Sequence, residues 1–288
     1  MKESKINKNY SLNCRGRLLD LSKPQVMGIL NLTPDSFSDG GKYNEKSAAL
    51  LRVEQMLKEG ASMIDIGGYS SRPFADDISE EEEWGRIEEI TRLTIKEFPE
   101  AIISIDTFRS GVAKKALDLG AHIINDISAG LLDEEMMDLV SSYGDVPYIM
   151  MHMKGNPRIM QVNPDSENIV EEVWNYFVKR INASLKAGIK DLVIDPGYGF
   201  GKTLLHNYEL VGKLGRFTRL GFPILTGISR KSMLYTFFDT EPGDVLEVAT
   251  ALHLKLLEKG SNILRVHDVK EAVRIVNLYN YLEDHGIV

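Results

Sequence analysis

Short apolar runs, rich in β-branched residues, recur along the chain and alternate with longer stretches that have helical periodicity. Each short run is too short for a helix and is typical of a strand buried on both faces. The predicted strands cover residues 26–30, 62–66, 101–105, 122–124, 148–151, 191–194, 224–228 and 262–266. The clearest predicted helices cover residues 48–59, 80–97, 110–119, 169–187 and 245–259. A capping box of Ser79 and Glu82 marks the start of the second helix.

Glycines mark the junctions between the predicted helices and the strands that follow. A helix that ends in a left-handed residue prefers glycine, because glycine has no Cβ to clash with the backbone. The junction glycines are Gly60, Gly120, Gly144, Gly188, Gly221 and Gly260. This regular alternation predicts parallel strands, either in an open doubly wound sheet or in a closed barrel.

The number and spacing of the strands favour the barrel. There are eight predicted strands, and their ends recur every ~34 residues, about one βα unit. No glycine-rich dinucleotide loop follows the first strand, as an open nucleotide-binding sheet would usually have. We therefore predict one α/β domain, an eight-stranded parallel (β/α)8 TIM barrel over residues 21–288. Residues 1–20 form a polar lead-in or a hairpin over the bottom of the barrel.

Composition and charge exclude several classes of protein. The 288 residues include 42 acidic and 34 basic side chains, and the net charge of −8 argues against nucleic-acid binding. The single cysteine, Cys14, cannot form an internal disulfide, and no Cys/His spacing of the zinc type occurs. The N-terminus lacks the apolar core of a signal peptide, and no apolar run reaches the ~20 residues of a membrane span. We expect a cytoplasmic protein that binds neither nucleic acid nor membranes.

Polar residues follow the predicted strands at the end of the barrel where active sites lie. Together they offer carboxylates, amides and cations that could hold a polar heterocycle on one side and an anion on the other. The set is Asn31, Ser71, Asp106, Asn125, Asp126, His152, Asp195, Ser229, Lys231, Arg265 and His267.

Three of these residues have more than one interpretation. Asp106 and Asp195 either cap the next helix or accept two parallel N–H bonds from a guanidine-like ring edge. Lys231 is a solvated loop residue, a Schiff-base lysine as in aldolases, or a donor to a ring oxygen. Each alternative is compatible with the position of the residue after its strand.

Arg265 and His267 are spaced by two on the last strand, so their side chains point to the same side. They either bind an anion near the eighth strand or, for the arginine, line the barrel in an ion pair with a core acid. His152 is interpreted as a core histidine. Asn31 and Asp35 offer too few oxygen ligands for an all-protein metal site, so a metal would be shared with a substrate phosphate.

Eight strings of the sequence together resemble the bacterial dihydropteroate synthases. They occur in the order of that family and extend over most of the chain, from about residue 26 to 275. The strings are MGILNLTPDSFSDGG, IDIGGYSSRP, ISIDT, IINDI, MMHMKGNP, IDPGYGFGK, SRKSM and RVHDV. The first and the last of them are the most specific.

The resemblance implies an enzyme of folate synthesis that joins (7,8-dihydropterin-6-yl)methyl diphosphate to p-aminobenzoate, with Mg²⁺ as cofactor. It implies catalytic roles for Asp106, Lys231, Arg265 and His267. By the same resemblance, the pterin is held by Asp106, Asn125, Asp195 and Lys231, and the diphosphate by Arg265, His267 and Asn31, with Asn31 also near the metal. Ser71 contacts the substrates, and the p-aminobenzoate pocket, which also takes sulfonamide inhibitors, is formed by Phe37, Arg72, Pro73, Phe200 and Ser229.

The second loop departs from the pattern of the family. It reads GGYSSRPF, where the family usually has glutamate in place of Tyr69, threonine in place of Ser71 and glycine in place of Phe74. Ser71 keeps the hydroxyl group. Tyr69 and Phe74 are therefore expected to change the loop geometry and the sulfonamide response more than the chemistry.

The reaction is expected to be a dissociative, SN1-like displacement. The leaving diphosphate needs charge neutralisation, and Asp106 would stabilise the cation that the pterin ring delocalises. Two other functions stay open at this point: a pterin-dependent methyltransferase barrel, and a pterin-binding protein without catalytic activity.

Family members pair through their last helix, and the resemblance therefore implies a homodimer. The apolar residues Val269, Val273, Val276 and Leu278 lie on that predicted helix. The alternative is that they face the barrel, as apolar positions at helical spacing commonly do.

Overall fold

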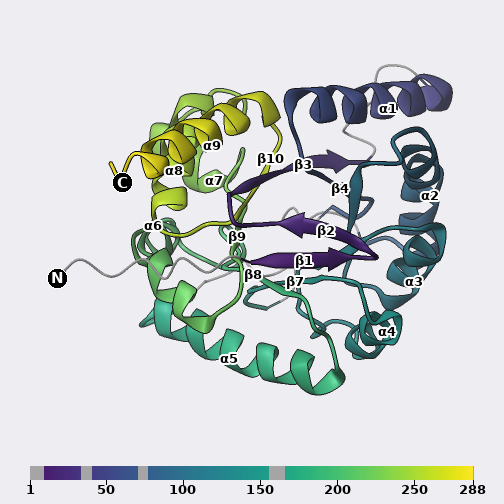
Figure 1. Ribbon diagram of the computed structural model, residues 1–288, viewed down its shortest axis with the longest axis horizontal. Coiled ribbons are helices and arrows are strands. Elements are labelled where there is room, and N and C mark those ends of the chain that lie inside the picture. The colour runs from purple at the N-terminus through teal and green to yellow at the C-terminus, as the bar shows by residue number, and fades with distance from the viewer. Residues whose placement is uncertain (1–9, 34–40, 71–76, 156–165, 288) are drawn as a thin grey trace.

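The computed structural model describes residues 10–33, 41–70, 77–155 and 166–287. Eight parallel strands form the centre, and helices surround them (Figure 1). The central strands are β3 (Gln25–Asn31), β4 (Met63–Gly67), β5 (Ile102–Asp106), β6 (Ile123–Asp126), β7 (Tyr148–Met151), β8 (Leu192–Asp195), β9 (Leu225–Thr226) and β10 (Ile263–Val266). The helices are α1 (Gly41–Glu59), α2 (Glu80–Glu97), α3 (Ser110–Leu119), α4 (Met136–Tyr143), α5 (Ile169–Ala187), α6 (Leu204–Lys213), the 3-10 helix η2 (Leu214–Leu220), α7 (Ser232–Phe238), α8 (Leu246–Glu258) and α9 (Val269–Asp284).

The strands close into the predicted barrel. Their order is β8-β7-β6-β5-β4-β3-β10-β9, and every pair within it is parallel. An isolated parallel bridge between Ile194 and Ile224 joins β8 to the start of β9 and so closes the ring. All eight predicted strands are present, although β9 has only two residues.

The junction glycines adopt the backbone conformation that the sequence predicts. All six have positive φ, with values between 75° and 112°. At Gly120 and Gly188, for example, the backbone N–H groups donate to carbonyls of the last helical turn. The predicted cap of α2 is also present, because Ser79 Oγ accepts a hydrogen bond from the backbone N–H of Glu82 at 3.1 Å.

The bottom of the barrel is filled by one apolar layer. Each of the eight strands contributes one buried side chain: Met27, Met63, Ile102, Ile123, Ile149, Val193, Leu225 and Ile263. An antiparallel hairpin, β1 (Ser11–Cys14) with β2 (Arg17–Asp20), covers this layer and adds Leu12, Cys14 and Leu19. Figure 1 shows the hairpin lying across the ring of strands. Of the two alternatives for the N-terminal segment, the structure therefore has the hairpin for residues 11–20.

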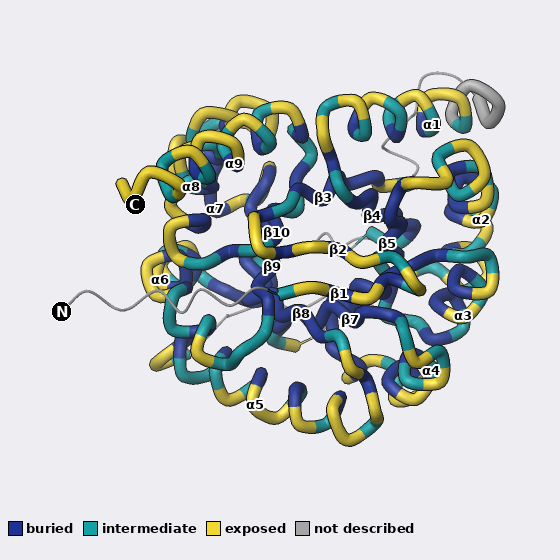
Figure 2. Tube along the Cα trace, in the orientation of Figure 1, coloured by how far each residue is buried: buried dark blue, intermediate teal, exposed yellow. Residues whose placement is uncertain are grey.

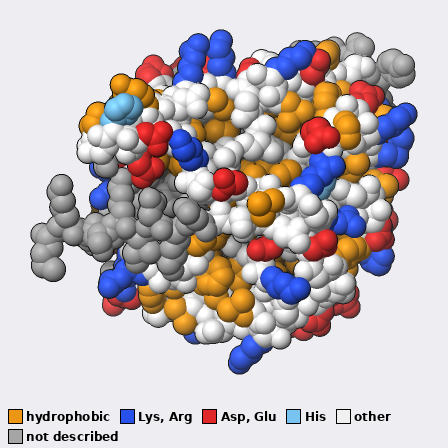
Figure 3. All heavy atoms as spheres, in the orientation of Figure 1, with side chains coloured by type: hydrophobic (Ala, Val, Ile, Leu, Met, Phe, Trp, Pro, Cys, Tyr) orange, Lys and Arg blue, Asp and Glu red, His pale blue; other side chains and the backbone are white. Residues whose placement is uncertain are grey.

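The buried residues lie in the strands and on the sides of the helices that face them (Figure 2). Figure 2 also shows that the outward sides of the helices are exposed. On the face that carries the hairpin, basic and acidic side chains are interspersed (Figure 3). Within the part of the chain that the structure describes, no helix combines the length and the apolar character needed to cross a membrane.

Candidate active site

Strand alternation stacks two further layers of inward-facing residues above the apolar floor. Because side chains two residues apart in a strand point to the same face, the residues two positions after each floor residue form a middle layer, and those four positions after lie at or just beyond the strand ends as a top layer. The middle layer consists of Ile29, Asp65, Ser104, Asn125, Met151, Asp195, Gly227 and Arg265. The top layer consists of Asn31, Gly67, Asp106, Ile127, Met153, Gly197, Ser229 and His267. Polar chemistry therefore begins one layer above the floor.

Arg265 is the centre of a buried charge cluster. Its Nε donates to Oδ2 of Asp65 at 2.5 Å, and its Nη2 donates to Oδ2 of Asp106. Asn125 Nδ2 donates to the same oxygen of Asp65 at 2.9 Å. The ion pair with a core acid, one of the two interpretations of Arg265, is thus present. The cluster links β10 to β4, β5 and β6 across the interior of the barrel.

Asp65 is a site residue that the sequence analysis missed. It is fully buried, and its second carboxylate oxygen, Oδ1, has no hydrogen-bond partner among the described residues. Asp65 lies in the middle of β4, whereas the predicted site residues lie near or just after the ends of the predicted strands. A charged residue inside an otherwise apolar strand, two positions after Met63, was the available indication, because charged side chains are seldom buried without a partner.

The charge cluster changes the acidity of its members. Burial raises the pKa of Asp106 to about 7, while Arg265 opposes this shift and the nearby Asp65 adds to it. For Arg265, burial acts to lower the pKa, but Asp65 and Asp106 outweigh it and the pKa is raised. Arg265 therefore stays charged, and Asp106 is ionised only around neutral pH and above.

Lys231 and Asp195 lie next to this cluster. The Nζ of Lys231 donates to the backbone carbonyl of Tyr198 at 2.6 Å and lies 4.4 Å from the ring centroid of Phe200. Burial lowers the pKa of Lys231 to about 8, although the charge of Asp195 opposes the shift. Asp195 is buried and accepts a hydrogen bond from the backbone N–H of Gly197 at 2.8 Å. These contacts exclude the interpretation of Lys231 as a solvated loop residue.

His267 and Ser229 form a pair at the rim between β9 and β10. Ser229 Oγ lies 3.1 Å from His267 Nδ1 and also accepts the backbone N–H of His267 at 3.2 Å. Burial, together with the charges of Arg230 and Arg265, lowers the pKa of His267 to about 3. At neutral pH this imidazole is uncharged and offers an N–H donor rather than a positive charge.

An apolar wall stands opposite the charged residues. Ile127, Met151, Met153 and Phe200 form one buried cluster, and Phe108 packs against it. Only Phe200 belongs to the predicted site. Met151 is the last residue of β7, and Ile127 and Met153 lie one and two residues beyond the ends of β6 and β7.

Two other strand-end residues have structural roles. Asp126 faces away from the interior and accepts hydrogen bonds from Tyr148 Oη and from the backbone N–H groups of Ser128 and Gly130. His152 is buried, as its interpretation as a core histidine predicts, and its ring lies edge-on to Tyr176 with the centroids 4.8 Å apart.

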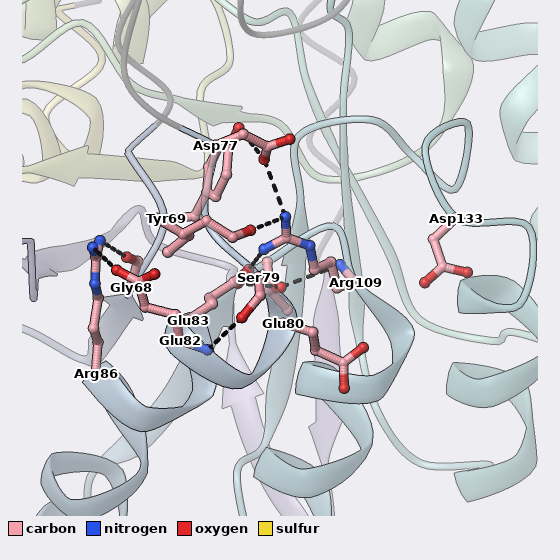
Figure 4. Close-up of polar contacts among 12 residues, drawn as sticks. Gly68, Tyr69, Asp77, Ser79, Glu80, Glu82, Glu83, Arg86, Arg109 and Asp133 are labelled. Atoms are coloured by element: carbon pink, nitrogen blue, oxygen red, sulfur yellow. Dashed lines mark hydrogen bonds and ion pairs between the residues drawn. The ribbon is translucent and has the colours of Figure 1, made fainter.

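Arg109 anchors both ends of the second loop (Figure 4). It donates to Glu83 Oε2 at 2.6 Å, to the carbonyl of Ile78 at 2.6 Å and to Asp77 Oδ1 at 3.2 Å. Its guanidinium carbon lies 5.2 Å from the ring centroid of Tyr69, the residue that replaces the glutamate of the family. Tyr69 thus takes part in an aromatic and cationic contact at the base of this loop.

Four predicted site residues fall outside the described residues: Phe37, Ser71, Arg72 and Pro73. Asp35 and Phe74 lie outside them as well. Asn31 is described and lies at the end of β3, where it is exposed. A Cβ added to Gly67 would lie 3.7 Å from Asn31 Oδ1 and 3.3 Å from Asp106 Cβ, so Asn31 and Asp106 flank the same glycine.

The chain matches the model of the pterin binding enzyme family over residues 27–267. It is 44% identical over 260 residues to the dihydropteroate synthase of Haemophilus influenzae, which covers 90% of this chain and 94% of the relative. To the Escherichia coli dihydropteroate synthase it is 41% identical over 269 residues, with 93% and 94% covered.

Solved structures of dihydropteroate synthases are similar to this chain along almost its whole length. The Yersinia pestis dihydropteroate synthase, solved with a sulfonamide drug, superimposes with a TM-score of 0.89 at 38% identity, covering 96% of this chain and 100% of that one. The Xanthomonas albilineans dihydropteroate synthase in complex with 7,8-dihydropteroate superimposes with a TM-score of 0.86 at 36% identity, covering 95% and 99%.

Asp65→Ala tests the buried charge cluster. The variant leaves Arg265 buried with one anionic partner fewer, which should lower the free energy of unfolding by about 3–5 kcal/mol. Urea denaturation followed by circular dichroism measures this change. Asp118→Ala, which removes an exposed partner of Lys114, is the matched control and should leave stability almost unchanged. A loss of stability in Asp65→Ala no larger than in the control would contradict the assigned cluster.

Proposed function

The chain belongs to the pterin binding enzyme family, as one of its dihydropteroate synthases, and we propose how its described residues carry out the reaction of these enzymes. The enzyme is a transferase that condenses (7,8-dihydropterin-6-yl)methyl diphosphate with p-aminobenzoate to give 7,8-dihydropteroate and diphosphate. The observation that carries the residue assignment is the division of the barrel mouth. Buried acids, an amide and two cations face an apolar wall across it.

The middle layer suits the polar edge of a pterin. The 2-amino-pyrimidinone edge presents parallel N–H donors, which a carboxylate accepts better than a neutral side chain does. In our proposal Asp195 takes this edge, Asn125 adds an amide contact, and Lys231 donates to the ring oxygen. The flat faces of the ring pack against Met151 and Phe200 of the apolar wall.

The carboxylates of Asp65 and Asp106, which both bind Arg265, lie where they can stabilise positive charge on the pterin. Breaking the bond between the methylene carbon and the diphosphate oxygen leaves a cation that the ring delocalises. A fixed anion stabilises this cation more than it stabilises the neutral ring of the bound substrate, which lowers the barrier. Asp106 is held by Arg265 at the top layer and is assigned this role. The step is dissociative, and the arylamine then attacks the cation.

Arg265 and His267 are assigned to the departing diphosphate. With Nε and Nη2 of Arg265 used by the two acids, Nη1 has no hydrogen-bond acceptor among the described residues and is available to an anion. The neutral His267 contributes an N–H donor. Because the polyanion would favour the charged imidazole, its binding should raise the pKa of His267 from its low value.

Asn31 fits a shared magnesium site. Its amide oxygen is a hard ligand at the rim, and the described residues contain no group of three or more acidic, histidine or cysteine side chains that could hold a metal by themselves. This donor set suits Mg²⁺, which keeps several waters and binds through substrate phosphates. When bound, the ion would supply Lewis-acid neutralisation of the leaving diphosphate.

The p-aminobenzoate pocket is proposed at the same mouth. Of its five predicted residues the structure describes Phe200 and Ser229, whereas Phe37, Arg72 and Pro73 lie outside the described residues. The arylamine is neutral at pH 7 and needs no general base before it attacks. It needs positioning and the exclusion of water instead. Sulfonamides that mimic p-aminobenzoate would occupy this pocket.

We further propose that the enzyme is a cytoplasmic homodimer. Val269 and Val276 pack against the barrel, so these two do not form a dimer contact. The exposed apolar residues Phe237 and Phe238 lie on α7, and Leu278 and Tyr281 lie on α9. Light scattering on the purified protein should give twice the chain mass, and a monomer at micromolar concentration would contradict this proposal.

Asp106→Asn tests the assigned reaction and its main residue. The variant keeps the shape of the side chain and removes its charge, so kcat should fall by roughly 10²–10³-fold while the fold is retained. Mass spectrometry of dihydropteroate, formed from the two substrates and Mg²⁺, measures turnover. Asp118→Asn, on the exposed side of α3, is the control with unchanged turnover.

Each outcome of this assay separates the alternatives. Full activity of Asp106→Asn would remove the role of Asp106 in stabilising the cation. Pterin binding by the wild type without any product would favour the non-catalytic protein, and methyl transfer to a corrinoid would favour the methyltransferase.

The pH dependence of kcat/KM should be bell-shaped. Asp106 must be ionised, so kcat/KM falls as the pH drops below about 7, where this carboxyl takes up a proton. The Lys231 amine must be charged, so kcat/KM also falls as the pH rises above about 8. Lys231→Met should lose the alkaline limb and keep the acid limb. An unchanged alkaline limb in that variant would assign it to another group.

A further inference from the structure

Lys202 is a fully buried amine that the proposed reaction does not use. Its side chain is 3% exposed, and its Nζ lies within hydrogen-bond distance of four acceptors. It donates to the carbonyls of Gly197 at 2.7 Å, Phe200 at 3.0 Å and His152 at 3.2 Å. The fourth contact is with His152 Nδ1 at 3.0 Å. So many acceptors around one amine make Lys202 the centre of a local network.

The network connects the loop after β8 to the end of β7. Two of the carbonyls belong to the loop of residues 196–203, and the other two acceptors belong to His152. The loop backbone also lies directly against this segment. A Cβ added to Gly197 would come within 1.9 Å of the His152 carbonyl oxygen, so only glycine permits this approach.

His152 accepts a hydrogen bond from Lys202 when the lysine is protonated; burial lowers the pKa of Lys202 to about 7, although the charge of Asp195 opposes the shift. An ammonium group has no lone pair, so Nδ1 of the imidazole must present its own. The proton is then on Nε2, which faces Glu172 Oε1 at 3.9 Å. Burial and the charge of Lys202 lower the pKa of His152 well below its usual range, in agreement with a neutral ring.

Lys202 is not placed to bind phosphate. Gly201, Lys202 and Thr203 match the ending of a phosphate-binding Walker loop, but Pro196 stands where that motif requires its first glycine. The ammonium group faces carbonyl oxygens of its own loop instead. Thr203 caps α6 by accepting the backbone N–H of His206 at 3.1 Å.

The loop of residues 196–203 contacts Lys231 and Asp195, the residues proposed to bind the pterin. Its Tyr198 carbonyl receives the Nζ of Lys231 at 2.6 Å, and the ring of Phe200 lies under the same amine. The backbone N–H of Gly197 binds Asp195. A shift of this loop would therefore displace the Lys231 amine, one carboxylate and part of the apolar wall together.

We propose that Lys202 is a positioning residue for dihydropteroate synthesis, which ties the loop of residues 196–203 to His152 and thereby fixes Lys231 and Phe200. This proposal rests on the roles given to Lys231 and Phe200 under the proposed function. Lysine suits the position because three N–H donors radiate from one compact atom and can reach carbonyls on several sides. Methionine has a similar length and no donor.

The test measures kcat and KM for both substrates in Lys202→Met, with Lys190→Met, an exposed lysine, as the matched control. Misplaced contact groups should raise KM for both the pterin diphosphate and p-aminobenzoate by about tenfold or more. Lys190→Met should match the wild type. Wild-type values of KM and kcat in Lys202→Met would overturn the proposal.

A second pair of variants keeps Lys202 and changes its one side-chain acceptor, His152 Nδ1. This pair tests the proposal if Lys202→Met does not fold. His152→Asn places an oxygen near the position of Nδ1 and should keep KM within a factor of about three. His152→Leu removes Nδ1 but keeps the backbone carbonyl of residue 152, so it should raise KM more than His152→Asn and less than Lys202→Met does. Equal KM values for the two His152 variants, at equal thermal stability, would overturn the proposal. Combining His152→Leu with Lys202→Met should add little to Lys202→Met alone, because both break one network.

Failure of the proposed function would look different. It would appear as a wild-type protein that forms no dihydropteroate, whatever residue stands at position 202. If Lys231→Met bound the pterin diphosphate as well as the wild type did while Lys202→Met did not, the route through Lys231 would be overturned.

Discussion

The site depends on how the barrel accommodates the buried guanidinium of Arg265. An isolated charge in an apolar interior is very costly, and it persists only where opposite charges and hydrogen bonds surround it. Arg265 on β10 meets this condition by reaching past β3, whose inward residue in that layer is Ile29, to Asp65 on β4 and Asp106 on β5. Asn125 on β6 extends the network through Asp65. Four strands are thus held in register by the groups that face the substrate, so the interactions that stabilise the middle of the barrel also preorganise its chemistry.

The two sides of the barrel mouth suit the two properties of a pterin. Its edge carries hydrogen-bond donors and acceptors, and its faces are flat and largely apolar. The charged residues come from β4, β5, β8 and β10, whereas the apolar wall comes from β6, β7 and the loop after β8. Lys231 lies between them, with its amine bound to a loop carbonyl and close to the ring of Phe200. A ring placed between these two sides would keep its polar edge on the acids, and its methylene group would point toward the rim where Asn31 and His267 lie.

The sequence predicted the barrel well because each unit repeats the same local rules. A buried strand, a helix and a glycine with positive φ recur, and the glycines at positions 120 and 188 have the expected backbone. Site residues were predictable where they lie at the carboxyl end of a strand, as Asp106 and Asp195 do. Asp65 was missed because it lies in the middle of a strand, and Lys202 because three of its four partners are backbone carbonyls, which leave no pattern in a sequence. The bounds of α4, α6 and α7 were not predicted, although Gly144 and Gly221 indicated that helical stretches precede them; helices of seven to ten residues show little periodicity. Val269 and Val276 face the barrel, which their spacing alone could not distinguish from an exposed stripe.

The central claim is that a fixed carboxylate, held by Arg265, stabilises positive charge as the diphosphate leaves. The most direct test is the secondary kinetic isotope effect on kcat/KM for pterin diphosphate that carries deuterium at the reacting methylene. Since this carbon becomes planar in a dissociative transition state, the account predicts that the protium substrate reacts measurably faster than the deuterated one. Equal rates, under conditions where the chemical step limits turnover, would contradict it, because they would mean that the arylamine attacks before positive charge develops.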